Sequence, residues 1–372
     1  MQLIKDTDGR VTSIVMRKPF DMHHHVRDGE MLKVIAPMLA RRFAGGIIMP
    51  NTSPPIVTAK QVGDYRKRLL DETGEDFTPL MTMYLTDTLD CDEVMEASKL
   101  HDMFGVKYYP RGLTTNSDSG VADPASLWTP GTRPYEVLQT LSRIRRTLLL
   151  HAADGFDRTG KELNPYEQEP HFIRETLPRI KDAHPHLKIS VEHLSTIEGA
   201  DYMQSNGDAF LGCSLTSQHL LLDTRDLHRG GFNAHRSWFP IIQGEEHKER
   251  LLALAKKGLP FVWLGTDSAP HPVSDKEAAC CKGGVMMVHA GIELYAEAFD
   301  KAGALANLED FASKNGPNFY GVQQSNDTIT LRRQSWTVLE NFSLPVADGA
   351  DPRSGVVRPF RLGEQVEWQL AA

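Results

Sequence analysis

The stretch Phe20-Asp21-Met22-His23-His24-His25-Val26-Arg27-Asp28-Gly29 sets three consecutive histidines at the end of a short extended run. Side chains alternate between the faces of a β-strand, so His23 and His25 share one face and His24 takes the other. Two imidazoles about 6–7 Å apart on one strand face can chelate a single cation. The pair is weak evidence alone, because a chain with 15 histidines holds about 0.6 His-x-His pairs by chance.

The composition limits the class of partner. The chain has 372 residues with 40% hydrophobic and 24% charged content, and its formal charge of −8 argues against nucleic-acid binding. A small anion held by a few local cations is compatible with that charge. No apolar run approaches the roughly 20 residues that span a membrane. The N-terminus lacks the basic start and apolar core of a secretion signal, so we expect a cytoplasmic protein.

The cysteines favour the same compartment. Cys91, Cys213, Cys280 and Cys281 form no C-x-x-C pair. A reducing environment is the simplest interpretation, and a cysteine–zinc site is not expected. A metal would be held by His, Asp and Lys side chains.

From Phe20 onward, short apolar runs alternate with amphipathic helical patterns. The expected helices include 59–73, 92–103, 134–145, 170–183 and 245–257. The runs expected to be strands are 20–25, 46–50, 78–85, 105–109, 147–152, 188–193, 209–215 and 261–267. Short, continuously apolar strands are typical of a parallel sheet buried on both faces. Eight such units predict an α/β fold, a (β/α)8 TIM barrel, and the alternative is a doubly wound open sheet.

Elements outside the barrel are expected at both ends of the chain. Residues 2–16 predict a hairpin with a turn at Asp8-Gly9, and helices are expected at 286–301 and 308–315. Strand-like pieces at 327–331, 336–339 and 366–370 could pair with the hairpin in a satellite sheet. We expect one domain, 1–372, with a barrel core of about 18–320, the hairpin 1–17 and a C-terminal extension 321–372 packed on it.

Polar residues cluster where the predicted strands end, which is where barrels carry their chemistry. They are His23, His25 and Arg27 on the first strand, Asn51 after the second, Lys107 in the fourth, His151 on the fifth, Glu192 and His193 on the sixth, and Asp267 and His271 on or after the eighth. Each has an ordinary structural explanation, such as a hydrogen-bonded histidine or a helix-capping aspartate. Those explanations would have to hold at five strands at once, so a metal centre is favoured.

The residue types indicate definite chemistry. Neutral imidazoles and a carboxylate suit zinc. Lys107 lies in an apolar strand, where desolvation lowers a lysine pKa, and an unprotonated amine can capture CO₂ as a carbamate that bridges two cations. Two metals would turn a shared water into hydroxide and polarise a carbonyl. Asp267 would then serve as ligand and proton shuttle.

This set resembles the amidohydrolase superfamily, and the flanking sequence is similar to the bacterial dihydroorotases. The matching words are His25-Val26-Arg27-Asp28-Gly29, Met49-Pro50-Asn51, Asp76-Phe77-Thr78-Pro79-Leu80-Met81, Tyr84-Leu85-Thr86-Asp87, Thr114-Thr115-Asn116-Ser117, Gly265-Thr266-Asp267-Ser268-Ala269-Pro270-His271 and Asn315-Gly316-Pro317. They run in order over nearly the whole predicted barrel.

The resemblance implies two Zn²⁺ ions per subunit of a homodimer. One would be held by His23, His25 and Asp267, and the other by His151 and His193, with N6-carboxylated Lys107 bridging both. It implies that Arg27, Asn51 and His271 bind the substrate α-carboxylate and that Thr114 and Thr115 form a mobile flap. His151 and backbone atoms of Phe239 and Gly283 would complete the substrate site.

The implied reaction is the reversible cyclisation of N-carbamoyl-L-aspartate to (S)-dihydroorotate in pyrimidine biosynthesis, through a metal-bridged hydroxide. One alternative is another cyclic amidohydrolase, such as a hydantoinase or an allantoinase, but Arg27 and Asn51 favour a substrate with an α-carboxylate. The other is a metal-free scaffold relative, yet all six ligand positions are filled. The long N-terminal hairpin has no functional interpretation, and Cys280 and Cys281 are expected in a packed loop.

Overall fold

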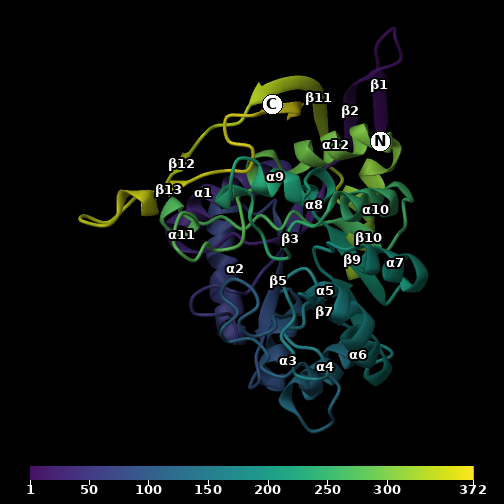
Figure 1. Ribbon diagram of the computed structural model, residues 1–372, viewed down its shortest axis with the longest axis vertical. Helices are drawn as coiled ribbons and strands as arrows, with labels where there is room; N and C mark the ends of the chain where they lie inside the picture. Colours follow the sequence, from purple (N-terminus) through teal and green to yellow (C-terminus); the bar gives the residue numbers. More distant parts are fainter. Residues whose placement is uncertain (372) are drawn as a thin grey trace.

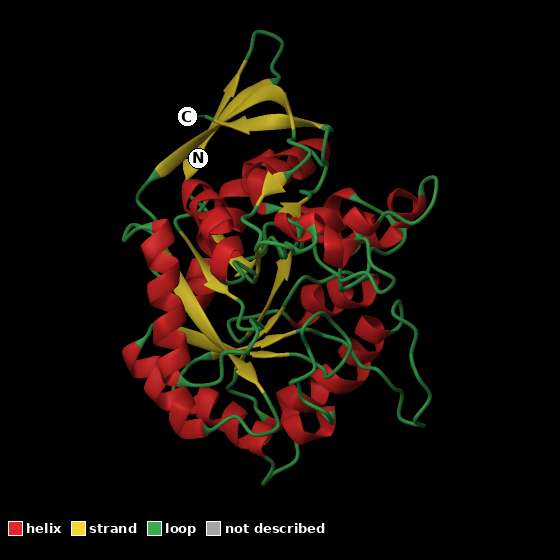
Figure 2. Ribbon diagram, turned by 90° about the vertical axis from the view of Figure 1, so that its left-hand side faces the viewer, coloured by secondary structure: helices red, strands yellow, loops and turns green. Residues whose placement is uncertain are grey.

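A computed structural model describes residues 1–371, in which eight parallel strands form one sheet in sequential order. The strands are β3 (Phe20–His24), β4 (Gly45–Ile48), β5 (Thr78–Leu85), β6 (Met103–Tyr108), β7 (Thr147–Leu150), β8 (Lys188–Val191), β9 (Leu211–Leu215) and β10 (Val262–Leu264). Strand β10 lies against β3, and His24 bridges Ser268 just beyond β10, which closes the sheet. The predicted (β/α)8 barrel is confirmed, with helices outside the strands (Figure 2).

The barrel strands are apolar because both of their faces are buried. Ile47, Leu80, Leu149 and Trp263 belong to a buried cluster that also contains Phe20 and Met22. Glycine permits the closest strand contacts: a Cβ on Gly105 would lie 2.5 Å from the Thr147 carbonyl oxygen. Large hydrophobic side chains therefore fill much of the interior, together with a few buried polar residues such as Asp21, Thr82 and Ser190.

Thirteen α-helices occur in residues 1–371. They are α1 (Gly29–Arg42), α2 (Ala59–Thr73), α3 (Cys91–Leu100), α4 (Arg133–Arg143), α5 (Gln168–His171), α6 (Leu177–Ala183), α7 (Ile197–Asn206), α8 (Ser217–Leu221), α9 (Thr224–His228), α10 (Glu245–Lys256), α11 (Val273–Lys276), α12 (Gly291–Lys301) and α13 (Asn315–Tyr320). Helix α2 has the predicted bounds, because a capping box between Thr58 and Gln61 defines its start. No helix of this part of the chain is long and apolar enough to cross a membrane.

Three predicted helices differ in detail. The 170–183 segment is α5 and α6 joined by a π-helical turn, Phe172–Thr176. The helix expected from 286 begins only at Gly291, because Met286 pairs with Pro359 in a β-bridge. The helix expected at 308–315 is a π-helical turn, Asp310–Lys314, that continues into α13.

A four-stranded antiparallel sheet joins the two ends of the chain. Strands β1 (Gln2–Lys5), β2 (Val11–Arg17), β11 (Thr328–Thr337) and β14 (Gln365–Leu370) pair in the order β1-β2-β11-β14, which confirms the predicted satellite sheet. The pieces expected at 327–331 and 336–339 lie largely in the single strand β11, whose register with β14 shifts between Arg333 and Trp336. Both termini lie at this sheet, above the barrel in the view of Figure 2.

The C-terminal extension also reaches the loop that follows β10. Strands β12 (Phe342–Ser343) and β13 (Val356–Val357) form the base of an arm that projects from the body (Figure 1). Val357 forms a β-bridge with Pro272. The extension therefore supports the segment between His271 and Met286, which belongs to the site described next.

Candidate active site

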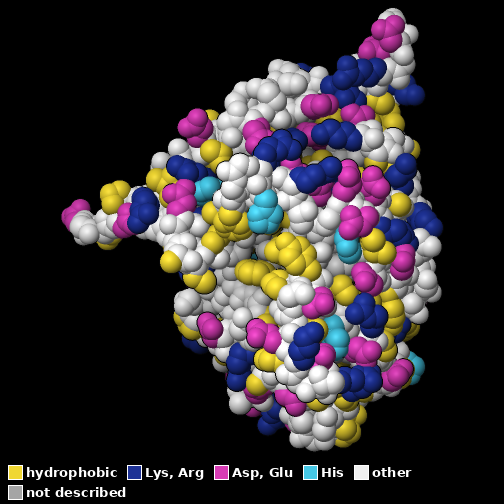
Figure 3. Space-filling model, in the orientation of Figure 1, with side chains coloured by type: hydrophobic (Ala, Val, Ile, Leu, Met, Phe, Trp, Pro, Cys, Tyr) yellow, Lys and Arg dark blue, Asp and Glu magenta, His cyan; other side chains and the backbone are white. Residues whose placement is uncertain are grey.

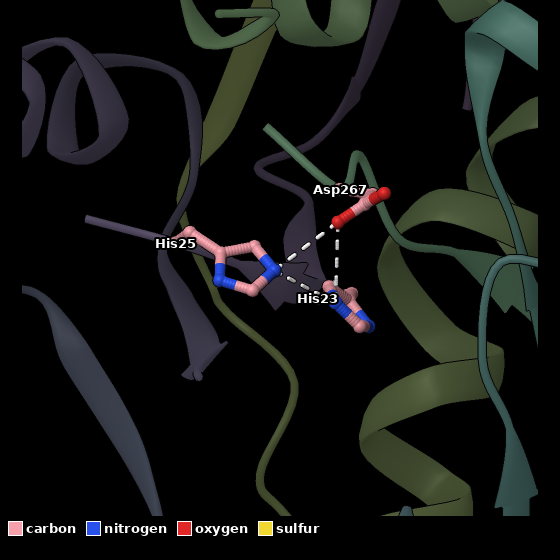
Figure 4. A group of neighbouring side chains, drawn as sticks. All are labelled: His23, His25 and Asp267. Atoms are coloured by element: carbon pink, nitrogen blue, oxygen red, sulfur yellow. Dashed lines mark hydrogen bonds and ion pairs between the residues drawn. The ribbon is translucent and has the colours of Figure 1, made fainter. Parts of the chain in front are cut away.

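His23, His25 and Asp267 converge at the carboxyl end of the barrel strands (Figure 4). Asp267 Oδ1 lies 3.3 Å from His23 Nε2 and 3.2 Å from His25 Nε2, and the two Nε2 atoms are 3.3 Å apart. The Asp267 backbone N–H donates to the His23 carbonyl at 3.0 Å, which ties the loop after β10 to β3. Two imidazoles and a carboxylate in this arrangement suit a zinc-like divalent cation.

Hydrogen bonds on the far side of each ring orient these histidines. His23 Nδ1 lies 2.7 Å from Glu192 Oε2, and His25 Nδ1 lies 2.8 Å from Asn51 Oδ1. Because both partners are acceptor oxygens, the ring protons belong on Nδ1 and the Nε2 lone pairs face Asp267. Burial lowers the pKa of both imidazoles, so they are neutral, the form in which histidine binds a metal.

A second pair of histidines lies beside the first group. His151 Nδ1 is 3.2 Å from His193 Nε2, and the His193 ring centroid is 5.0 Å from that of His23. Burial lowers the pKa of His151 to about 3. His193 has a left-handed backbone with φ 43°, and its N–H donates to Ser214 Oγ at 2.8 Å. The chain thus presents a second neutral pair of nitrogen donors.

Lys107 is fully buried on β6. Its Nζ has no hydrogen-bond partner among the described residues. Burial lowers its pKa to about 8, against the opposing influence of Glu192 and Asp267. An orphaned buried amine is costly to maintain. It fits a group that becomes carboxylated, since a carbamate would place two acceptor oxygens among the metal donors.

Asp267 has the electrostatics of a proton carrier. Burial raises its pKa to about 8, although Lys107 and Arg27 act to lower it. Its φ of 47° is a left-handed conformation that is uncommon outside glycine, and such backbone strain concentrates at functional sites. The carboxylate is therefore held in one place, and in the metal-free chain its pKa is raised by burial.

Arg27 provides a cation beside this centre. Its Nε donates to the Pro270 carbonyl at 3.0 Å, and its Nη2 lies 2.9 Å from His271 Nε2. Neither partner is an acid, so the guanidinium charge is uncompensated by these contacts. A positioned arginine whose charge is not paired with an acid in these contacts suits a carboxylate ligand.

A loop covers the cavity. Thr115 Oγ1 donates to the Gly283 carbonyl at 3.0 Å, and Asn51 Nδ2 donates to the Thr115 carbonyl at 3.3 Å. Phe239 closes the side next to Gly283, where an added Cβ would lie 2.2 Å from the phenylalanine ring. That contact requires glycine at position 283.

The structure brings the sequence-predicted residues into one place. Those lining the cavity are His23, His25, Arg27, Asn51, Thr114, Thr115, His151, His193, Phe239, Asp267 and Gly283. Lys107 and His271 lie just behind this lining, with Lys107 Nζ 5.2 Å from the Tyr109 ring centroid and His271 against Arg27. His24 points away and bonds Asp21 at 2.8 Å, as alternation along β3 predicts.

Sequence reasoning missed two contributors. Tyr109 lines the cavity, and it could have been found because it lies two residues beyond Lys107, on the same side of the extended chain. Glu192 stood out at a strand end without a role, and its bond to His23 depends on a contact between distant strands. That contact leaves no local sequence signal.

Comparison with known proteins gives a consistent family. The dihydroorotase of Acidovorax sp. (strain JS42) is 39% identical over 362 residues, covering 97% of this chain and 98% of that protein. The structure of dihydroorotase in complex with 5-fluoroorotic acid from Saccharomyces cerevisiae superposes with a TM-score of 0.86 at 28% identity, covering 97% and 99% of the two chains. The L-hydantoinase (dihydropyrimidinase) of Arthrobacter aurescens, at 18% identity and a TM-score of 0.72 over 96% of this chain and 83% of that one, shares the fold. No protein-family model matches.

Proposed function

The chain belongs to the dihydroorotase family, and on that premise we propose how its barrel mouth carries out the reaction. The protein is a metal-dependent cyclic amide hydrolase that interconverts N-carbamoyl-L-aspartate and (S)-dihydroorotate in pyrimidine biosynthesis.

The cofactor would be two Zn²⁺ ions per subunit. His23, His25 and Asp267 would hold one ion, and His151 and His193 would hold the other. Lys107, carboxylated on Nζ, would supply oxygen ligands to both. The observation that carries this assignment is the buried, unpartnered Lys107 amine beside two pairs of neutral imidazoles. When bound, zinc lowers the pKa of water and polarises the amide carbonyl.

Asp267 moves the proton. In hydrolysis it accepts a proton from the attacking water and delivers it to the departing amide nitrogen of dihydroorotate. In the biosynthetic direction the protonated Asp267 assists the loss of water. In the metal-free chain, burial raises the pKa of Asp267, which supports a carboxylate that can take up a proton during the reaction.

The remaining residues bind and orient substrate. Arg27, Asn51 and His271 hold the α-carboxylate, and the Thr114 and Thr115 hydroxyls close over it. His151 and backbone atoms of Phe239 and Gly283 contact the ring. The fit is supported by the uncompensated Arg27 charge and by the loop contact of Thr115 with Gly283. A hydantoin lacks the carboxylate that this arrangement would bind, so a hydantoinase is disfavoured.

The cellular setting completes the proposal. We infer a cytoplasmic homodimer of a single-domain chain, 1–372, with a barrel core of about 18–320. The four cysteines are all free thiols, which supports a reducing compartment.

One experiment tests both specificity and metal. Purified protein is assayed with dihydroorotate and with an unsubstituted hydantoin, and its zinc content is measured on the same preparation. We expect hydrolysis of dihydroorotate with two zinc ions per chain. Faster turnover of the hydantoin would contradict the substrate assignment, and turnover without metal would contradict the cofactor assignment.

A further inference from the structure

A second cavity lies at the opposite end of the barrel from the candidate active site. It encloses about 620 Å³, and its walls include Arg145, Arg146, His186, Lys188, Phe210 and Tyr320. Arg145 and Arg146 precede β7, Lys188 opens β8, and Phe210 precedes β9. Because parallel strands begin at the same end of a barrel, these residues gather at its amino end, away from Asp267.

The charge of this cavity is of one sign. Three Lys or Arg side chains and a histidine line it, and no Asp or Glu does. The chain as a whole has more acidic than basic residues, 49 against 41, and both signs are interspersed over the face in Figure 3. The Lys and Arg residues of the lining have no acidic neighbour in it, and the composition of the whole chain does not explain this local excess of positive charge.

Neutral groups satisfy the cations only in part. Arg146 Nε donates to Ser98 Oγ at 2.9 Å, and Lys188 Nζ donates to the Phe319 carbonyl at 2.5 Å. Burial lowers the pKa of Lys188 with no neighbouring carboxylate to raise it. The Asp102 carboxylate opposes the lowering of the Arg146 pKa by burial. However, Asp102 does not line the cavity, and it forms an ion pair with Arg66 at 3.0 Å. The cations of the cavity thus lack an anionic partner within it.

An aromatic surface adjoins the charges. Phe210 is 44% exposed, and its ring meets that of His186 edge-on at a centroid distance of 6.5 Å. Exposed aromatic rings beside cations are the surfaces on which planar bases stack. The volume lies within the range of about 300–1,000 Å³ that is typical of small-molecule sites.

We propose that this cavity binds a phosphate ester that carries a planar ring, the chemistry of a nucleotide. The phosphate oxygens would lie against Arg145, Arg146 and Lys188, since guanidinium groups bind phosphate through paired hydrogen bonds. The planar ring would stack on Phe210. This site is independent of the reaction proposed above.

The test is calorimetric titration of the full chain with ATP, tripolyphosphate and adenosine at physiological salt. We expect saturable ATP binding that Arg145→Glu weakens at least about tenfold. The matched control is Arg143→Glu, which changes an exposed arginine of α4 that does not line the cavity and is expected to leave binding unchanged. Phe210→Ala should weaken ATP binding and leave tripolyphosphate binding unchanged.

Several outcomes would overturn the proposal. The proposed site would be ruled out if ATP did not bind saturably, or if ATP bound the Arg145→Glu and Arg143→Glu variants with equal affinity. If tripolyphosphate bound as tightly as ATP, the planar ring would contribute nothing to recognition, and that part of the proposal would be wrong. Competition by dihydroorotate would place the bound ATP at the barrel mouth instead. Matching thermal melting of the two arginine variants is the check on folding.

Discussion

Asn51 lies between a predicted metal ligand and the loop that covers the site. Its Oδ1 is 2.8 Å from His25 Nδ1, and its Nδ2 donates to the Thr115 carbonyl at 3.3 Å. One amide side chain therefore contacts both the proposed metal ligand His25 and the loop that covers the cavity. The proposed role of Asn51 in binding the substrate carboxylate would give the same group a third function.

Replacing Asn51 should affect metal and substrate together. Asn51→Ala removes the acceptor that orients His25, so we expect zinc affinity to fall by about 10–100-fold. Thr115→Ala keeps the backbone carbonyl but loses the hydroxyl bond to Gly283, so it should raise KM with zinc affinity unchanged. Chelator competition and steady-state kinetics on both variants measure the difference. Identical zinc affinities in the two variants would refute the link between Asn51 and His25.

Glu192 should act on the metal through His23. Glu192→Ala removes the acceptor 2.7 Å from His23 Nδ1, and we expect zinc affinity to fall by about 10–100-fold. Glu192→Gln retains an acceptor oxygen and should lose less. Zinc retention during dialysis against a chelator separates the two. Equal loss in both variants would show that the charge of Glu192, rather than its hydrogen bond, is what matters.

Asp267 should make the stability of the metal-free chain depend on pH. Burial raises its pKa from an ordinary 3.8 to about 8, so between these values the folded chain holds a proton that the unfolded chain has released. The free energy of unfolding therefore falls as pH rises toward about 8. Other groups titrate in the same pH range. Their contribution cancels when the stability of Asp267→Asn is subtracted from that of wild type at each pH.

The measurement is thermal melting of metal-free wild type and Asp267→Asn from about pH 6.5 to 8.5, above the ordinary histidine pKa. Wild type should lose stability relative to the variant as pH rises. Zinc should abolish the trend, because a bound cation stabilises the carboxylate. A constant difference across the range would rule out a raised Asp267 pKa.

Arg27 should select for a charged substrate. Its guanidinium is hydrogen-bonded to Pro270 and His271, neither of which is an acid, so removing it breaks no ion pair among the described residues and should be tolerated by the fold. Arg27→Ala should raise KM for carbamoyl aspartate by about 10–100-fold, in keeping with the loss of a charge-assisted bidentate bond. An uncharged cyclic amide is the control substrate. Comparable losses for both substrates would exclude a role in binding the carboxylate.

The parts of this molecule that follow local rules could be predicted from the sequence. The apolar runs and their spacing give the barrel, and alternation along β3 separates His23 and His25 from His24. Because parallel barrel strands end at the same mouth, the fold alone predicts that Lys107, His151, His193 and Asp267 lie close together.

The remainder depends on contacts between distant segments. Helix α12 starts late because Met286 is paired with Pro359, which no helical pattern reveals. The bonds from Glu192 to His23 and from Asn51 to Thr115 join elements whose approach only the closed barrel defines. The basic cavity likewise forms from four segments that are far apart in sequence.

Lys107 provides the most direct test of the two-metal account. Metal analysis and activity are measured on wild type and on Lys107→Ala, with and without added acetate or propionate. The account predicts two zinc ions per chain in wild type, loss of metal and activity in Lys107→Ala, and partial recovery of both with the added carboxylic acid. Lys107→Ala that retains two zinc ions and the wild-type rate without additive would contradict it.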